Sequence, residues 1–126
     1  MGRWPVKFDK VDRLWSQYIH KRDGEMCRYC GRSNIKLEAA HIVGRRYSAT
    51  RYLPECGLIL CYSCHEQFDH GTKIETNPFR RDVIEKTIGF PAYWRLKFAA
   101  RTGMKKRMAR MTAEIVLTKA IKEMEA

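Results

Sequence analysis

The residues best suited to chemistry lie between Cys27 and His70, where two Cys-x-x-Cys pairs bracket a segment of 30 residues. The pairs are Cys27/Cys30 and Cys61/Cys64. Two thiolates separated by a short turn point the same way, so two such pairs complete one tetrahedral zinc site. The alternative is a set of four unligated core cysteines. We expect a closed structural zinc site that fastens the base of the enclosed segment and leaves no open position for chemistry.

Within that segment, His41 is followed by Cys56 fifteen residues later, and Cys56 by His65 nine residues after that. His41 lies in an apolar, half-alternating run from Leu37 to Val43, which predicts a β-strand. A histidine that is largely neutral near pH 7 can accept a proton from water. The alternatives are a buried strand histidine at position 41 and, at position 65, a partner of the zinc ligands.

These residues and their neighbours resemble the HNH endonuclease family, whose ββα-metal unit carries a histidine, an asparagine and a histidine in this order. The matching segments are Ala40-His41-Ile42, Cys56-Gly57-Leu58-Ile59-Leu60-Cys61 and Cys61-Tyr-Ser-Cys-His65. The likeness is closest to small phage-borne HNH proteins, through Arg45-Arg46, Thr50-Arg51 and Cys64-His65-x-x-Phe68. It covers about residues 9 to 95.

The resemblance implies a metal-dependent DNA endonuclease that hydrolyses phosphodiesters and leaves a 5′ phosphate and a 3′ hydroxyl. His41 would act as the general base, and His65 would hold one divalent ion. On a helix, Asp69 shares a face with His65 and is the expected second ligand, with His70 in reserve. Mg²⁺ or Mn²⁺ suits carboxylate and water ligands. The resemblance also implies a bacteriophage setting, with DNA-packaging proteins as partners.

Two positions depart from the family pattern. Cys56 stands where the family has asparagine, and Ala40 where many members have a metal-binding Asp or His. The family's asparagine braces the loop between the strands and orients the histidine, and a thiol is a poor hydrogen-bonding substitute. We therefore expect Cys56 to belong to the catalytic set but to damp cleavage, and Ala40 to weaken binding of the catalytic ion.

Composition points to a partner that is a polyanion. The chain of 126 residues carries 25 Lys and Arg against 14 Asp and Glu, a formal net charge of +11. Nucleic acid is the expected partner, and a membrane surface is the lesser alternative. No stretch approaches the ~20 apolar residues of a membrane span. The odd cysteine count, five, argues against a disulfide framework and favours the reducing cytoplasm, here of a bacterial host cell.

Apolar periodicity and turn residues predict an α+β fold: a ββα-metal core stapled by zinc, with flanking helices. We expect an N-terminal arm at residues 1–8, the nuclease domain at 9–95 and a helical extension at 96–126. Asp9 is the expected N-cap of the first helix. The expected strands span residues 35–39, running on toward Val43, and 58–61. The expected later helices span residues 62–69, 79–88, 92–101 and 104–125, and residues 44–54 are expected to form a loop.

Basic residues gather at two places. Arg45, Arg46 and Arg51 lie in the expected loop beside His41, where a guanidinium fork matches two phosphate oxygens. The residues Lys105, Lys106 and Arg107 begin the last helix, where positive charge opposes the helix dipole and indicates another duty. We expect both groups to contact DNA. The alternatives are ordinary solvated charge and, for the last helix, a methionine stripe that packs on the core or forms a homodimer.

Two other classes of protein remain open from the sequence. One is a zinc module that binds DNA with little or no catalysis. The other is a structural or assembly protein that uses the long terminal helix as a docking surface. Metal-dependent nicking of a plasmid separates the nuclease from both, and salt-sensitive DNA binding separates the two alternatives from each other.

Overall fold

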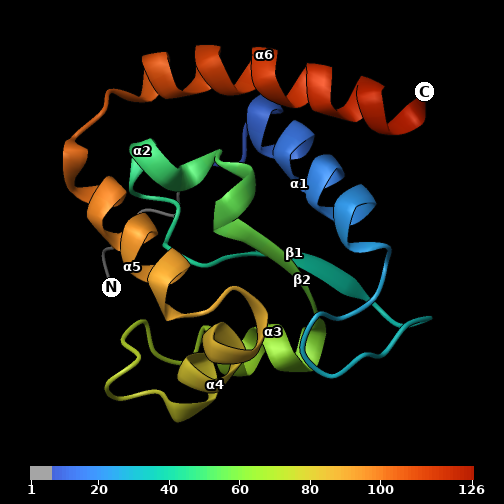
Figure 1. The fold of residues 1–126 in the computed structure, drawn as a ribbon, viewed down its shortest axis with the longest axis vertical. Coiled ribbons are helices and arrows are strands. Elements are labelled where there is room, and N and C mark those ends of the chain that lie inside the picture. Colours follow the sequence, from blue (N-terminus) through green and yellow to red (C-terminus); the bar gives the residue numbers. More distant parts are fainter. Residues whose placement is uncertain (1–6) are drawn as a thin grey trace.

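The structure, a computed structural model, describes residues 7–126. The predicted N-terminal arm, residues 1–8, therefore lies outside the described residues except for its last two. The elements in chain order are α1 (Lys10–Asp23), β1 (Leu37–His41), α2 (Ser48–Arg51), the 3₁₀ turn η1 (Pro54–Cys56), β2 (Gly57–Cys61), α3 (Tyr62–Phe68), α4 (Pro78–Thr87), α5 (Phe90–Ala99), the 3₁₀ turn η2 (Ala100–Thr102) and α6 (Lys106–Glu125). The α+β class and the long C-terminal helix are confirmed (Figure 1).

A two-stranded antiparallel sheet lies at the centre, and helix α3 follows it directly. The register runs from Leu37 opposite Cys61 to His41 opposite Gly57. Each strand has five residues. Because side chains alternate between the two faces of a strand, this small sheet can contact a different layer on each side.

The helices cover the two faces of the sheet separately, and each face has its own core. Helices α1 and α6 form one layer, with Trp15, Ile19 and Leu117 in its core. Helices α3, α4 and α5 belong to the other layer, whose core includes Phe68, Val83 and the buried cysteines Cys27, Cys56, Cys61 and Cys64. Figure 1 shows α6 lying across α1 at the top and α3 with α4 below the strands.

Helix α1 begins at the predicted cap. The Asp9 carboxylate accepts a hydrogen bond from the Asp12 backbone N–H at 2.8 Å, and the Asp12 carboxylate accepts one from the Asp9 N–H at 2.7 Å. This reciprocal pair satisfies backbone donors that a helix end leaves open. Gly24 ends the helix in the left-handed conformation, with a φ of 72°.

The structure differs from the sequence-based expectations in three places. The expected loop at residues 44–54 contains helix α2, because Thr50, Arg51 and Tyr52 turn inward and are buried. Strand β1 is shifted toward the carboxyl end and reaches His41. The expected boundary between residues 95 and 96 falls inside α5, and α6 shares a core with α1.

Candidate metal centre and the two histidines

The sulfur atoms of Cys27, Cys30, Cys61 and Cys64 all lie within 4.8 Å of one another. A tetrahedral zinc ion with Zn–S bonds of about 2.3 Å holds its sulfurs roughly 3.8 Å apart. The Cys30 and Cys61 sulfurs are 3.8 Å apart. None of the five cysteines, all within the described residues, forms a disulfide. The four cysteines can therefore hold a structural metal ion such as zinc, and they form the predicted cluster.

Backbone geometry on both sides prepares this cluster. In the first pair, the Cys30 N–H lies 3.4 Å from the Cys27 sulfur, and Gly31 takes a φ of 80° that closes the turn. Burial raises the pKa of the Cys27 thiol, but hydrogen bonds from backbone N–H groups outweigh it and bring the pKa to about 7. In the second pair, Cys61 ends β2 and caps α3, and its sulfur lies 3.5 Å from the Cys64 N–H.

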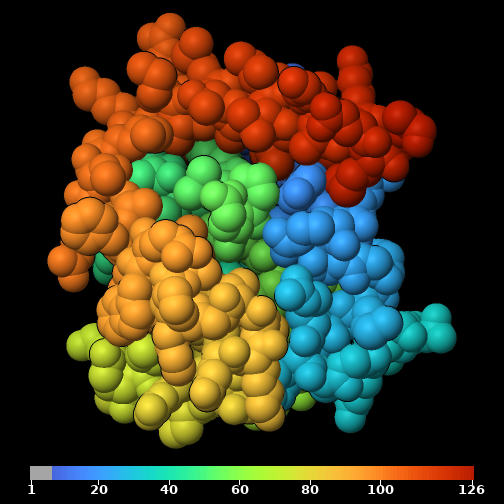
Figure 2. Space-filling view, viewed as in Figure 1, coloured from blue at the N-terminus to red at the C-terminus, as the bar shows by residue number. Residues whose placement is uncertain are grey.

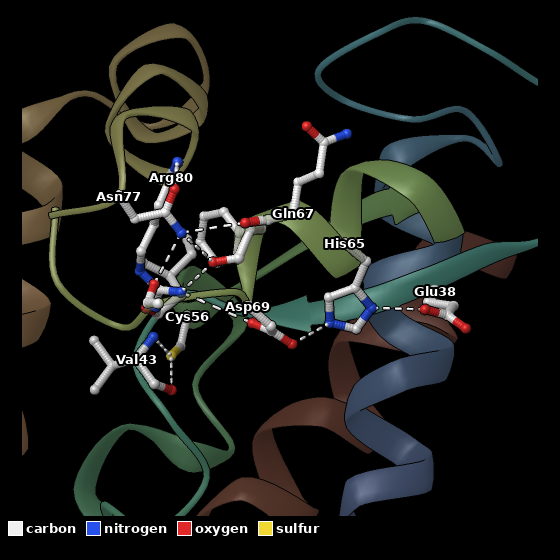
Figure 3. Close-up of polar contacts among 11 residues, drawn as sticks. Glu38, Val43, Cys56, His65, Gln67, Asp69, Asn77 and Arg80 are labelled. Carbon is white, nitrogen blue, oxygen red and sulfur yellow. Dashed lines mark hydrogen bonds and ion pairs between the residues drawn. The ribbon is translucent and has the colours of Figure 1, made fainter.

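His65 on α3 lies between two carboxylates (Figure 3). Its Nδ1 is 2.7 Å from Oε1 of Glu38 on β1, and its Nε2 is 3.0 Å from Oδ2 of Asp69. The hydrogen bond with Asp69, the largest influence, and the one with Glu38 raise the pKa of His65 against the opposing effect of burial. The predicted pairing of His65 with Asp69 is thus present in the geometry. An ion that replaces the proton on one ring nitrogen would leave the other nitrogen held by a carboxylate.

His70 is placed elsewhere. It is exposed in the turn after α3, and no hydrogen bond or ion pair within residues 7–126 joins it to His65. Glu38 takes part instead, although the sequence analysis did not select it. Strand alternation was the available signal, because residues 38 and 40 share the face that α3 covers.

His41 ends β1 and is held on two sides. Its ring stacks on Trp15 of α1, with ring centroids 3.9 Å apart and planes 12° apart. Its Nε2 lies 3.0 Å from the Arg51 carbonyl oxygen, which can only accept, so Nε2 donates and Nδ1 keeps its lone pair. Burial lowers the pKa of His41 to about 4, so the ring is neutral at pH 7.

Gly57 is the reason that Trp15 can lie beneath His41. It faces His41 in the strand register, and a Cβ at this position would lie 2.3 Å from Cζ2 of Trp15 and 2.9 Å from Cδ1 of Ile19. No side chain fits at that distance. The indole is anchored at its other edge by a hydrogen bond of 2.8 Å from its Nε1 to the Leu53 carbonyl oxygen.

The structure does not bring His41 into contact with His65. Glu38, which contacts His65, and Ala40 lie on the strand face toward α3, and Ala40 belongs to that core. His41 lies on the opposite face and stacks on α1. The two histidines therefore occupy different sides of the sheet near its edge.

Cys56 is fully buried and braces the segment that follows β1. Its sulfur lies 3.4 Å from the Val43 nitrogen and 3.4 Å from the Val43 oxygen. Burial raises the pKa of this thiol to about 11, so it stays protonated and can donate. The Ile42 N–H adds a bond of 2.7 Å to the Cys56 carbonyl oxygen. Cys56 thus performs a bracing role of the kind that the resemblance assigns to asparagine.

Two residues of the α4 region that the sequence analysis did not select fix the end of α3. The buried guanidinium of Arg80 donates to the Phe68 carbonyl oxygen at 2.9 Å and to the Ile42 carbonyl oxygen at 2.6 Å. The Asn77 amide nitrogen lies 3.2 Å from the Phe68 carbonyl oxygen (Figure 3). Asp69 follows Phe68 directly, so these bonds set the position of a candidate ligand relative to the strand that carries His41.

The predicted DNA contacts divide into two groups. Arg51 is only 2% exposed, and its guanidinium contacts the Asp12 carboxylate at 3.0 and 2.5 Å. Its prediction as a DNA-binding residue was wrong, because its charge is spent on a buried ion pair. Arg46 is exposed and Arg45 partly so, and Lys105, Lys106 and Arg107 are exposed at the start of α6.

Comparison with protein-family models, with curated proteins and with solved structures found no match to this chain. Among residues 7–126, no helix combines the length and apolar character that a membrane crossing requires.

Proposed function

We propose that the protein is a zinc-stapled, metal-dependent DNA endonuclease that hydrolyses phosphodiesters. The observation that supports this most is the setting of His65 between Glu38 and Asp69. A carboxylate on one ring nitrogen fixes the ring and raises its basicity, as in many metal-binding histidines. The Asp69 side chain is 57% exposed, so the other nitrogen meets a carboxylate that is open to a substrate phosphate.

The donor set fits a hard divalent ion. The His65 Nε2 and the Asp69 Oδ2 are close enough to share one ion, and an imidazole with a carboxylate and waters suits Mg²⁺ or Mn²⁺. When bound, such an ion would polarise the phosphate and stabilise the departing 3′ oxygen. Glu38 would hold the His65 ring, and Arg80 and Asn77 would hold the chain that carries Asp69.

His41 is proposed to accept the proton of the attacking water through Nδ1. Its Nε2–H bond to the Arg51 carbonyl fixes the tautomer that leaves Nδ1 free. A pKa of about 4 makes it a weak base in the free protein. A phosphate beside the ring would raise that pKa, because negative charge favours the protonated form.

The separation of the two histidines is compatible with this chemistry. In an in-line displacement, the attacking and leaving oxygens lie on opposite sides of phosphorus. The base and the ion therefore act at opposite ends of the scissile phosphate and need not touch each other.

The test is nicking of supercoiled plasmid by zinc-retaining protein, with and without added Mn²⁺. His41→Ala should lower cleavage by ~10² to 10⁴-fold because a general base is removed. His65→Ala and Asp69→Asn should lose cleavage that excess Mn²⁺ partly restores for Asp69→Asn. His70→Ala is the matched control and should cleave at the parent rate. Full cleavage by either His41→Ala or His65→Ala would exclude this mechanism.

A second candidate is a zinc module that binds DNA without cutting it. The low pKa of His41 and its distance from the contacts of His65 favour this reading, and the net charge of +11 suits it equally. It predicts salt-sensitive DNA binding with no nicking under any divalent ion. An assembly protein is a third candidate, favoured by the exposed Met108, Met111 and Ile115 on α6, and it predicts neither behaviour.

A further inference from the structure

Positive charge is concentrated in one segment of the chain that has no acidic residue. From Phe90 to Ala113 there is no Asp or Glu, while seven Lys and Arg occur: Arg95, Lys97, Arg101, Lys105, Lys106, Arg107 and Arg110. Arg110 forms an ion pair with Asp9. The other six form no ion pair within residues 7–126. Their charge therefore remains available to a partner from outside the chain.

Two aromatic side chains project from the same segment into solvent. Trp94 is 50% exposed and Phe98 is 75% exposed. They are four residues apart on α5 and therefore share one face of the helix. The opposite face, with Tyr93 and Leu96, is buried in the core, so the packing of α5 does not require the outward rings. Exposed flat rings beside unpaired cations mark a recognition surface.

We define the α5 surface as Trp94, Phe98, Arg95, Arg101 and Lys105. Figure 2 shows α5 and the beginning of α6 running continuously along one side of the molecule. Rings that accept stacking, with cations spaced among them, suit a strand whose bases are unpaired and whose phosphates are regularly spaced. Duplex DNA hides the faces of its bases within its own stack and offers these rings nothing to stack on. A second copy of this surface would bring like charges together.

We propose that the α5 surface binds single-stranded nucleic acid, with bases stacked on Trp94 and Phe98 and phosphates held by the basic side chains. The surface adjoins the candidate site, because α2 packs against α5, η2 and α6, and the last residue of α2 accepts the His41 hydrogen bond. Under the proposed function, on which this consequence rests, the substrate is DNA with an unpaired segment. The binding itself does not depend on cleavage.

The test measures binding of a labelled dT20 strand, an rU20 strand and a 20-base-pair duplex to zinc-retaining protein without added Mg²⁺ or Mn²⁺. We expect at least one of the single strands to bind about tenfold more tightly than the duplex. A Trp94→Ala/Phe98→Ala variant should lose about tenfold or more of that affinity. The matched control is Met111→Ala/Ile115→Ala on α6, which removes side chains that are 58% and 72% exposed, and it should stay within twofold. Zinc content and circular dichroism establish that both variants are folded.

Two further readouts separate stacking from simple charge attraction. Tryptophan emission should be quenched when dT20 is added, and Trp94→Phe should remove that quenching while keeping most of the affinity. Reversing Arg95 and Arg101 to Glu should flatten the dependence of dT20 binding on salt. Tight binding by either dT20 or rU20 supports the proposal, and their ratio tells whether the 2′-hydroxyl contributes.

Equal affinity for duplex and single strand would overturn the proposal, as would unchanged dT20 binding by Trp94→Ala/Phe98→Ala. Loss of a concentration-dependent dimer in that variant would assign the surface to a second copy and also overturn it. Protein that binds dT20 as expected but never cleaves refutes the nuclease alone. Protein that cleaves through His41 but binds dT20 no better than duplex refutes the α5 surface alone.

Discussion

The sulfur of Cys56 lies 3.4 Å from both the nitrogen and the oxygen of the Val43 backbone. One thiol thus accepts a hydrogen bond and donates another, and it ties the start of β2 to the chain that leaves His41. Sulfur hydrogen bonds are long and weak compared with those of an amide. The geometry of the brace is present, and its strength is what the cysteine limits.

Cys56→Asn should raise the rate of DNA cleavage several-fold, because an amide can accept from the Val43 N–H and donate to its carbonyl at shorter distances. A firmer brace would narrow the orientations of His41, and small displacements of a catalytic group are costly in rate. The measurement is the initial rate of plasmid nicking, with zinc content and thermal unfolding as checks on the fold.

The control for this prediction is Cys56→Ala, which removes both bonds. It should cleave more slowly and lose about 1 to 3 kcal/mol of stability, since two backbone groups are left unpaired in the core. A Cys56→Asn protein that is folded but no faster than the parent would show that the thiol is already a competent member of the site.

One zinc ion per chain should be present in natively purified protein. Strong chelation should unfold the domain, because metal binding and folding are coupled in small sites of this kind. Elemental analysis gives the stoichiometry, and circular dichroism follows the unfolding. Cys64→Ser should lose the metal, whereas Cys56→Ala should retain it, since the Cys56 sulfur is committed to Val43. Purified protein without zinc would contradict this assignment.

Arg51→Met should lower the free energy of unfolding by about 3 to 5 kcal/mol, because it leaves the buried Asp12 carboxylate without its partner. Arg46→Met is the matched control. Its guanidinium is exposed and contacts only the neighbouring Tyr47 hydroxyl, so the change should stay within about 0.5 kcal/mol. Urea unfolding measures both. Equal losses in the two variants would mean that the Arg51–Asp12 pair contributes no more than surface charge.

The stability of the parent should fall as the pH falls from 6.5 toward 4, owing to His41. In the folded chain, burial lowers the pKa of His41 from 6.5 to about 4, so in this window the unfolded chain binds more protons. At pH 5 this costs roughly 2 kcal/mol relative to pH 7.

His41→Gln removes the titrating group, so the gap in unfolding free energy between parent and variant should shift in the variant's favour by that amount between pH 7 and pH 5. The comparison cancels acid loss of zinc, which affects both proteins. Parallel stability curves over this range would contradict the buried, neutral state of His41.

Local signals in the sequence were enough for the zinc cysteines, the cap at Asp9 and the β–β–α order, because spacing, capping and periodicity act over a few residues. The missed features are long-range pairings. Glu38 meets His65 across 27 residues, Arg80 meets Ile42 across 38, and Arg51 meets Asp12 across 39. An arginine that reads as surface charge becomes a core residue only when another helix supplies its carboxylate, and no local pattern carries that information.

The contact between Gly57 and Trp15 limits how this sequence can drift. A change from glycine at position 57 pushes the indole away, and with it the flat support under His41. A smaller residue at position 15 would have to come first to make room for a side chain at 57, and it would leave the histidine unsupported in the meantime. In the descendants of this chain, positions 15, 41 and 57 should therefore be inherited together or replaced together.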